Sequence, residues 1–235
     1  MESTKIQIAL NAVDWNGNVN EFLAKHSLTE AVAQCNLRLA IWSKQLENAD
    51  KGNPALSFIR EMQIAGHYTA VLMSLALYKP AAAATRNVLE TALYYTYFRT
   101  HPSELATLVR NEDYFIHKSN IIEYHKLHTP KFTEFQSCFG FIGHLNQWYS
   151  RISSVIHGQV PGQWIKHKSI AEIKHEDANL HVVVNAFKEA EELVHHLLLC
   201  TVGVELWDSF STTAKHRLIS GLPGKTKGTL KLNSA

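Results

Sequence analysis

The chain reads WYSRISSVIHG from residue 148 to residue 158. Apolar residues recur at helical spacing through this stretch, and the pattern stops at Gly158, a residue type that ends helices in a left-handed conformation. We therefore expect a helix over residues 140–157 whose last residue is His157. An imidazole at that place lies at the negative end of the helix dipole, which favours its protonated form.

Three polar side chains of this helix form the first candidate site. Arg151, Ser154 and His157 are spaced three residues apart, so each is a neighbour of the next on a helical surface. A fixed cation beside an imidazole that exchanges a proton near neutral pH suits phosphodiester chemistry. The pattern therefore predicts a polar strip able to act on a phosphate.

The rest of the chain shows helical periodicity with short breaks, and no period-2 alternation that would indicate a sheet. No repeat and no linker divides it into two domains. The sequence predicts an all-α fold: a single-domain antiparallel helical bundle over residues 28–211, an irregular N-terminal arm over 1–27 and a basic C-terminal tail over 212–235. The expected helices besides 140–157 cover residues 28–48, 54–78, 81–101, 103–110, 114–127 and 177–211.

Composition limits the possible classes of protein. The chain has 23 Lys and Arg against 21 Asp and Glu, a net charge of +2, which argues against a surface that attracts nucleic acid everywhere but allows a local basic groove. Three cysteines, far apart and odd in number, indicate a reducing compartment. The N-terminus lacks a signal-peptide pattern, and the most apolar run, 193–207, is too short to span a bilayer. We expect a cytoplasmic protein without a membrane segment.

Two other motifs predict little. The Gly-Lys-Thr run at 224–226 lacks the glycine that a phosphate loop needs five residues earlier, where the chain has Ile219. Glu192 and His195 match the Glu-x-x-His spacing of di-iron bundles, but no second copy accompanies them. A metal-bearing bundle is thus the weakest hypothesis, and no metal or cofactor is expected.

A second arginine and histidine pair competes with the first. Arg110 and His117 would share one face, two turns apart, on an unbroken helix. The neighbouring acids Glu112 and Asp113 can instead pair with Arg110. The pair in the 148–158 stretch is therefore favoured.

The stretch 148–158 resembles the Arg-x(4–6)-His segment of the HEPN superfamily, the higher eukaryotes and prokaryotes nucleotide-binding domain. Its Ser-x-x-His-Gly ending, residues 154–158, is similar to uncharacterised bacterial HEPN-like families. Arg86 and Glu90 also resemble the Arg-x-x-x-Glu helix of those families. The likeness covers roughly residues 55–210.

The resemblance implies a helical bundle that forms a homodimer, in which the arginine and histidine of both copies meet in a cleft and cleave RNA without a metal, often as a toxin or defence effector. Carried over, His157 would be the general base or acid at the ribose 2′-hydroxyl, and Arg151 would stabilise the charge of the phosphorane. Arg86 and Glu90 would orient the pair from the neighbouring helix.

One position departs from this pattern. Catalytic members commonly have a polar residue directly after the arginine, and this chain has Ile152, whereas Arg110 is followed by Asn111. The departure leaves two alternatives open. Either the motif of Arg110 and His117 is the functional one, or the chain is a non-catalytic HEPN-like module that binds a protein partner, such as an antitoxin, or a nucleotide. An aromatic-rich segment at residues 94–98 is compatible with such binding.

Overall fold

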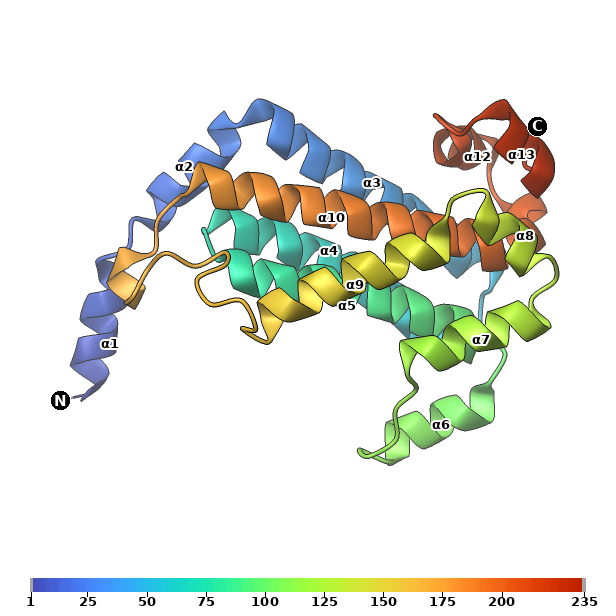
Figure 1. The fold of residues 1–235 in the computed structure, drawn as a ribbon, viewed down its shortest axis with the longest axis horizontal. Coiled ribbons are helices and arrows are strands. Elements are labelled where there is room, and N and C mark those ends of the chain that lie inside the picture. The colour runs from blue at the N-terminus through green and yellow to red at the C-terminus, as the bar shows by residue number, and fades with distance from the viewer. Residues whose placement is uncertain (1, 234–235) are drawn as a thin grey trace.

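The computed structural model describes residues 2–233 and shows an elongated all-α fold, with no strand among these residues (Figure 1). Five long helices lie side by side along the long axis. They are α3 (His26–Ala49), α4 (Leu56–Ser74), α5 (Tyr78–Phe98), α9 (Phe141–Ile156) and α10 (Asp177–Leu198). The shorter helices are α1 (Glu2–Asn11), α2 (Trp15–Ala24), α6 (Pro102–Arg110), α7 (Lys118–His128), α8 (Phe132–Ser137), α11 (Val204–Leu206), α12 (Thr212–Ile219) and α13 (Gly224–Leu230), and 3-10 turns cover Ile170–Glu172 and Trp207–Ser209.

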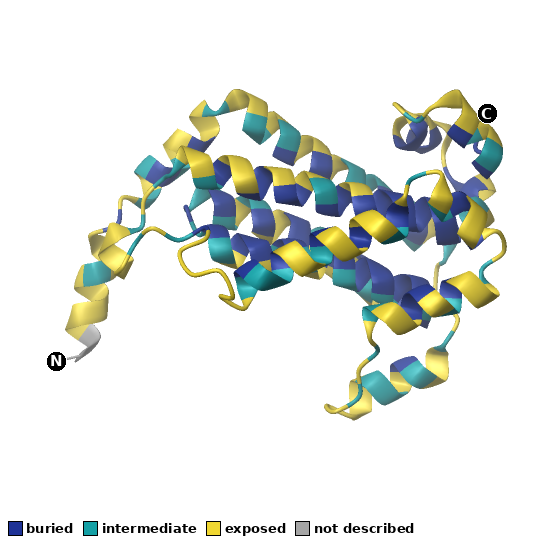
Figure 2. Cartoon of the chain, in the orientation of Figure 1, coloured by how far each residue is buried: buried dark blue, intermediate teal, exposed yellow. Residues whose placement is uncertain are grey.

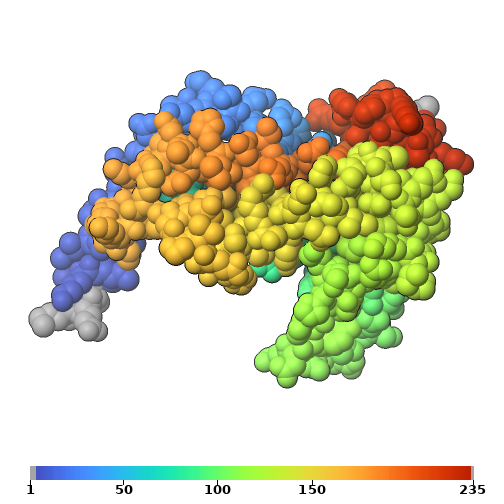
Figure 3. Space-filling view, in the orientation of Figure 1, coloured from blue at the N-terminus to red at the C-terminus, as the bar shows by residue number. Residues whose placement is uncertain are grey.

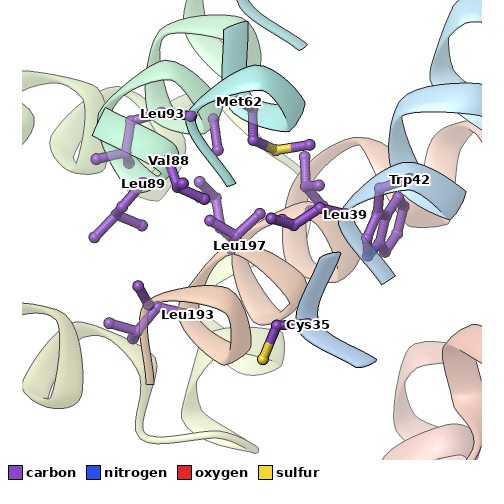
Figure 4. Close-up of a cluster of buried hydrophobic side chains, with 14 of the residues drawn as sticks. Cys35, Leu39, Trp42, Met62, Val88, Leu89, Leu93, Leu193 and Leu197 are labelled. Carbon is purple, nitrogen blue, oxygen red and sulfur yellow. The ribbon is translucent and has the colours of Figure 1, made fainter. Parts of the chain in front are cut away.

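Helices α5 and α10 form the centre of the bundle. They contact each other, and both contact α4 and α9. Helix α10 also contacts α3. Their buried faces meet along the middle of the molecule, while the outward faces of α3 and α9 are exposed (Figure 2). Burial of this apolar area, at about 25 cal/mol per Å², is the main favourable term in folding. Figure 4 shows part of this core, in which α3, α4, α5 and α10 contribute Leu39, Trp42, Met62, Val88, Leu89, Leu93, Leu193 and Leu197.

Helix α9 agrees closely with the stretch that predicted it. Its buried residues Leu145, Trp148, Ile152 and Val155 alternate between spacings of three and four, which places them on one face. The indole Nε1 of Trp148 donates to the carbonyl oxygen of Ala186 on α10 at 3.0 Å, so this face is also held in register.

The end of α9 is the predicted glycine stop. His157 is the C-cap residue, and Gly158 follows with φ +67°. The amide of Gly158 donates to Val155 at 3.2 Å, and the amide of Gln159 donates to Ser154 at 2.9 Å. This pair of bonds is a Schellman motif, which satisfies carbonyls that the helix end would leave unpaired.

Several predicted boundaries were wrong, and at the C-terminal end the reason is that tertiary packing overrides local composition. The N-terminal arm contains α1 and α2, and the linker after Thr129 contains α8. The expected helix 177–211 ends at Leu198 and continues as a π turn, Leu199–Gly203. The segment expected to be a loose basic tail forms α12 and α13, and its residues Leu218 and Leu230 are fully buried in the core.

Within the described residues, no helix combines the length and the apolar character needed to cross a membrane.

We expect Gly203 to be a packing position. A Cβ atom there would lie 2.8 Å from the carbonyl oxygen of Leu198 and 3.2 Å from the Trp42 ring, and Trp42 is fully buried. Gly203→Ala should therefore lower the free energy of unfolding by about 1–3 kcal/mol, as overpacking does. Urea denaturation of wild type and variant measures this change.

Gly143→Ala is the matched control. Gly143 is an exposed glycine inside α9 with no atom within 4 Å of an added Cβ, so alanine should stabilise the chain by about 0.5–1 kcal/mol. The two glycine-to-alanine substitutions should thus change the free energy of unfolding in opposite directions. Equal effects of the two substitutions would contradict the packing argument.

Candidate functional site

Two helices bring together most of the residues that the sequence singled out. Arg86 and Glu90 lie on α5, and His157 lies at the end of α9, which packs against α5. The guanidinium Nη1 of Arg86 lies 3.4 Å from Nε2 of His157 and 3.5 Å from Oγ of Ser153. Tyr149, Ser153 and His157 are spaced four apart, so one face of α9 is turned toward Arg86.

A hydrogen-bond network fixes the arginine. Arg86 donates from Nε to the Glu90 carboxylate at 2.9 Å and from Nη2 to the Tyr149 hydroxyl at 2.5 Å. The Tyr149 hydroxyl in turn donates to the same Glu90 oxygen at 2.5 Å, and the guanidinium carbon lies 4.6 Å from the centre of the Tyr149 ring. We call Arg86, Glu90, Tyr149, Ser153 and His157 the arginine cluster.

Burial and pairing act on the ionisable groups of this cluster. Partial burial opposes the charge of Arg86, but Glu90 and Tyr149 outweigh it and raise the pKa of the guanidinium. Burial, together with the hydrogen bond to Glu90, raises the pKa of Tyr149 to about 12. Tyr149 is therefore a neutral donor and Arg86 a permanent cation at neutral pH.

The arginine predicted to be catalytic lies elsewhere. Arg151 pairs with Glu189 of α10, and both side chains are about half exposed, at 55% and 46%. Six residues advance a helix by about 600°, so Arg151 and His157 project in different directions. The hydroxyl of Ser154 donates to the carbonyl oxygen of Arg151 at 2.7 Å and is thus engaged by its own helix. The expected strip of Arg151, Ser154 and His157 is not a shared face in the structure.

The competing pair is separated by a break in the helix. Arg110 is the last residue of α6, and its Nε donates to the Ala106 carbonyl at 3.0 Å. His117 is the N-cap residue of α7 in an extended conformation, with its ring 4.8 Å from that of Phe115. The unbroken helix that this alternative required is absent over residues 111–117.

Further cations surround the arginine cluster. The Lys79 Nζ lies 3.6 Å from the position that a Cβ atom on Gly158 would take. The Lys118 Nζ lies 4.9 Å from the centre of the Tyr149 ring and donates to Asn146 at 2.7 Å, and burial lowers its pKa. A cavity of about 150 Å³ beside Tyr149 and Lys118 also opens here. The surface is basic, with Glu90 as the acid within the cluster.

Sequence reasoning missed Tyr149, Ser153, Lys79 and Lys118. Tyr149, Ser153 and His157 follow one another at steps of four residues. This was a usable signal, because a four-residue spacing predicts a shared helix face as well as a three-residue spacing does. The two lysines had no such signal, because they come from other elements and reach the site through tertiary packing.

The histidine that matched the di-iron spacing, His195, is hydrogen-bonded inside the core. His195 is buried in α10, and its Nδ1 accepts a hydrogen bond from the Trp42 indole at 3.0 Å. Among residues 2–233, no group of three His, Cys, Asp or Glu side chains is placed to hold a metal ion.

Comparison of the chain with protein-family models, with curated proteins and with solved structures finds no match. The likeness to the HEPN superfamily stays a prediction from the sequence.

We expect Tyr149→Phe to destabilise the chain, because it removes a hydroxyl that both Arg86 and Glu90 use. The hydroxyl is only half-buried, so the loss at neutral pH should be about 1 kcal/mol, in the lower part of the range for a bond to a charged group. Urea denaturation measures it, and Tyr68→Phe, at an exposed tyrosine, is the control.

The same pair of variants predicts a pH dependence. The pKa of Tyr149 is about 12 in the folded chain against about 10 in an unfolded one, so its contribution is complete below pH ~10 and is lost as the pH rises toward 12. The stability gap between wild type and Tyr149→Phe should therefore narrow over that interval. A gap that widens with pH would contradict the assigned donor role.

Proposed function

We propose that the chain is a metal-independent endoribonuclease of HEPN type and that the arginine cluster is its active site. One observation carries this proposal: an exposed imidazole, that of His157, lies 3.4 Å from the fixed guanidinium of Arg86. Lys79 and Lys118 add positive charge around the pair. Such a surface attracts a phosphodiester, and the imidazole can move a proton.

In this proposal Arg86 takes the part that the resemblance gave to Arg151. His157 removes the proton of a ribose 2′-hydroxyl, and the resulting oxygen attacks the adjacent phosphorus. The bond from phosphorus to the 5′-oxygen breaks, and that oxygen takes a proton from water or from a second imidazole. The products are a 2′,3′-cyclic phosphate and a 5′-hydroxyl.

Arg86 would stabilise the charge that develops on the phosphorane oxygens. Its contacts with Glu90 and Tyr149 hold the guanidinium in place beforehand, which avoids reorganisation during the reaction. In the homodimer that the resemblance implies, a second copy of His157 would supply the acid for the leaving oxygen. A toxin or defence role would follow from the degradation of cellular RNA.

The test is RNA cleavage in the presence of a chelator. Wild type should cleave, His157→Ala should lose about 10²–10⁴ in rate as expected for a general acid or base, and Arg86→Lys should lose about 10²–10³. Product analysis should give cyclic phosphate ends. Size measurement by light scattering reports the dimer in the same preparation.

Arg151→Ala and His117→Ala are the matched controls, because they remove the same residue types outside the arginine cluster. Both should retain the wild-type rate. Loss of cleavage in His117→Ala but not in His157→Ala would move the site to the other motif. Equal cleavage by wild type and His157→Ala would remove the imidazole from the mechanism.

A second candidate function, a non-catalytic helical module that binds a protein or a nucleotide, is favoured by one observation. All three nitrogens of the Arg86 guanidinium already have partners within the chain. Under this reading the cluster ties α5 to α9. His157→Ala would then lower the melting temperature, and wild type would cleave no RNA.

A further inference from the structure

A separate cavity lies at the end of the bundle where the α4–α5 connection meets the loop between α9 and α10. Its volume is about 300 Å³. In Figure 3 teal atoms, the colour of the α4–α5 region, are visible at the bottom of a small hollow in the orange surface of that loop and α10. The residues that matter for its chemistry are Tyr78, Trp164, Lys166, His167, Lys174 and Asn179.

An unusual backbone places the aromatic wall of this cavity. Trp164 has φ +62°, a conformation that residues with a side chain rarely adopt, and Ala76, which also lines the cavity, has φ +58°. Trp164 is 7% exposed and is the buried residue of an otherwise open loop over 157–172. Strained residues of this kind cluster at binding sites, where surrounding structure holds them.

The carboxylates around the cavity are already paired. Glu176 accepts from the Lys166 ammonium at 2.8 Å, and Glu172 accepts from the Lys168 amide at 2.9 Å and from Ser169 at 3.1 Å. These bonds lower the pKa of both carboxylates and hold them ionised.

Lys174 is the second lysine of the cavity lining. Its ammonium has no ion pair among the residues that the structure describes, and neither has His167. The lining holds two lysines and two glutamates, and Glu176 and Glu172 act on Lys174 and His167 at longer range, so its charge is balanced. Lys174 is the lysine of the lining without a carboxylate in direct contact, and it lies beside a wall made by Trp164 and Tyr78.

These features together fit a nucleotide. An indole beside the cavity can stack with any nucleobase, and a free ammonium at the rim can pair with a phosphate. A volume of about 300 Å³ is at the small end of ligand pockets and suits a single nucleotide unit.

The cavity is connected to the arginine cluster through α5. Tyr78 lines the cavity, and the next residue, Lys79, lies against Gly158 beside His157. Arg86 follows Tyr78 by eight residues, which is about 12 Å along a helix. A single RNA strand laid along the first turns of α5 would be long enough to span both places.

We infer that this cavity holds one nucleotide of the RNA strand, with its base against Trp164 and a phosphate beside Lys174, while the scissile phosphate lies at the arginine cluster. The inference rests on the proposed function. It adds that the substrate is single-stranded and is held at a second point.

The first arm of the test measures cleavage of two substrates in chelator, a dinucleotide and an oligonucleotide long enough to span both places. Trp164→Leu and Lys174→Glu should each raise the KM for the oligonucleotide about tenfold or more and leave its kcat unchanged. Both variants should cleave the dinucleotide like wild type, because it does not reach the cavity. Lys51→Glu, an exposed lysine in the α3–α4 connection, is the control.

Equal losses on both substrates would overturn the inference, because they indicate damage to the fold or to the active site. Unchanged KM for the oligonucleotide in Lys174→Glu would overturn it as well, and this variant does not depend on the strained loop position.

The second arm separates this inference from the proposed function. Adenosine and uridine 5′-monophosphate are titrated by calorimetry into wild type, Lys174→Glu and Arg86→Lys. Binding that is weakened by Lys174→Glu and kept in Arg86→Lys supports the cavity even if wild type cleaves no RNA. Absence of binding, or binding that only Arg86→Lys weakens, overturns it.

Discussion

The packing of α9 onto α5 and α10 assembles the candidate site, because it brings Tyr149, Ser153 and His157 to Arg86 on α5. The buried ridge of Leu145, Trp148, Ile152 and Val155 admits one rotation of the helix about its axis, and the bond from Trp148 to Ala186 fixes its register. That rotation turns His157 toward α5 and Arg151 toward α10. A rotation of about 100°, equal to one residue, would carry His157 away from Arg86, so burial of the apolar ridge decides whether the imidazole meets that arginine.

The arginine cluster holds the Arg86 guanidinium firmly on two sides and only weakly on the third. Glu90 and Tyr149 hold two sides of the guanidinium by short bonds, while its third side faces Ser153 and His157 at 3.4 to 3.5 Å. The longer contacts are the weaker ones, because hydrogen-bond strength falls with distance. An anion can therefore displace them without breaking the network that positions the arginine.

The sequence predicted the all-α class, the five long helices and the glycine stop after His157, because periodicity and end signals are local properties. It also predicted that Arg86 and Glu90 share a face, which their ion pair confirms. It did not predict that Arg151 faces α10, because a spacing of three residues describes neighbours but not which neighbour meets another helix. Lys79 and Lys118 were out of reach for the same reason: their place depends on tertiary packing.

The two ends of the bundle differ in how they are built, and this difference bears on function. At one end Gly203 lies against the fully buried Trp42, and α8 contacts the π turn while α12 contacts α3, so displacement there must move packed atoms. At the other end most residues of the loop after Gly158 are exposed, Trp164 is its buried residue, and the turn Ile170–Glu172 contacts α1. The packed end therefore contributes more to the stability of the chain than the exposed loop does, and the candidate residues His157, Lys79 and Trp164 lie at the other end.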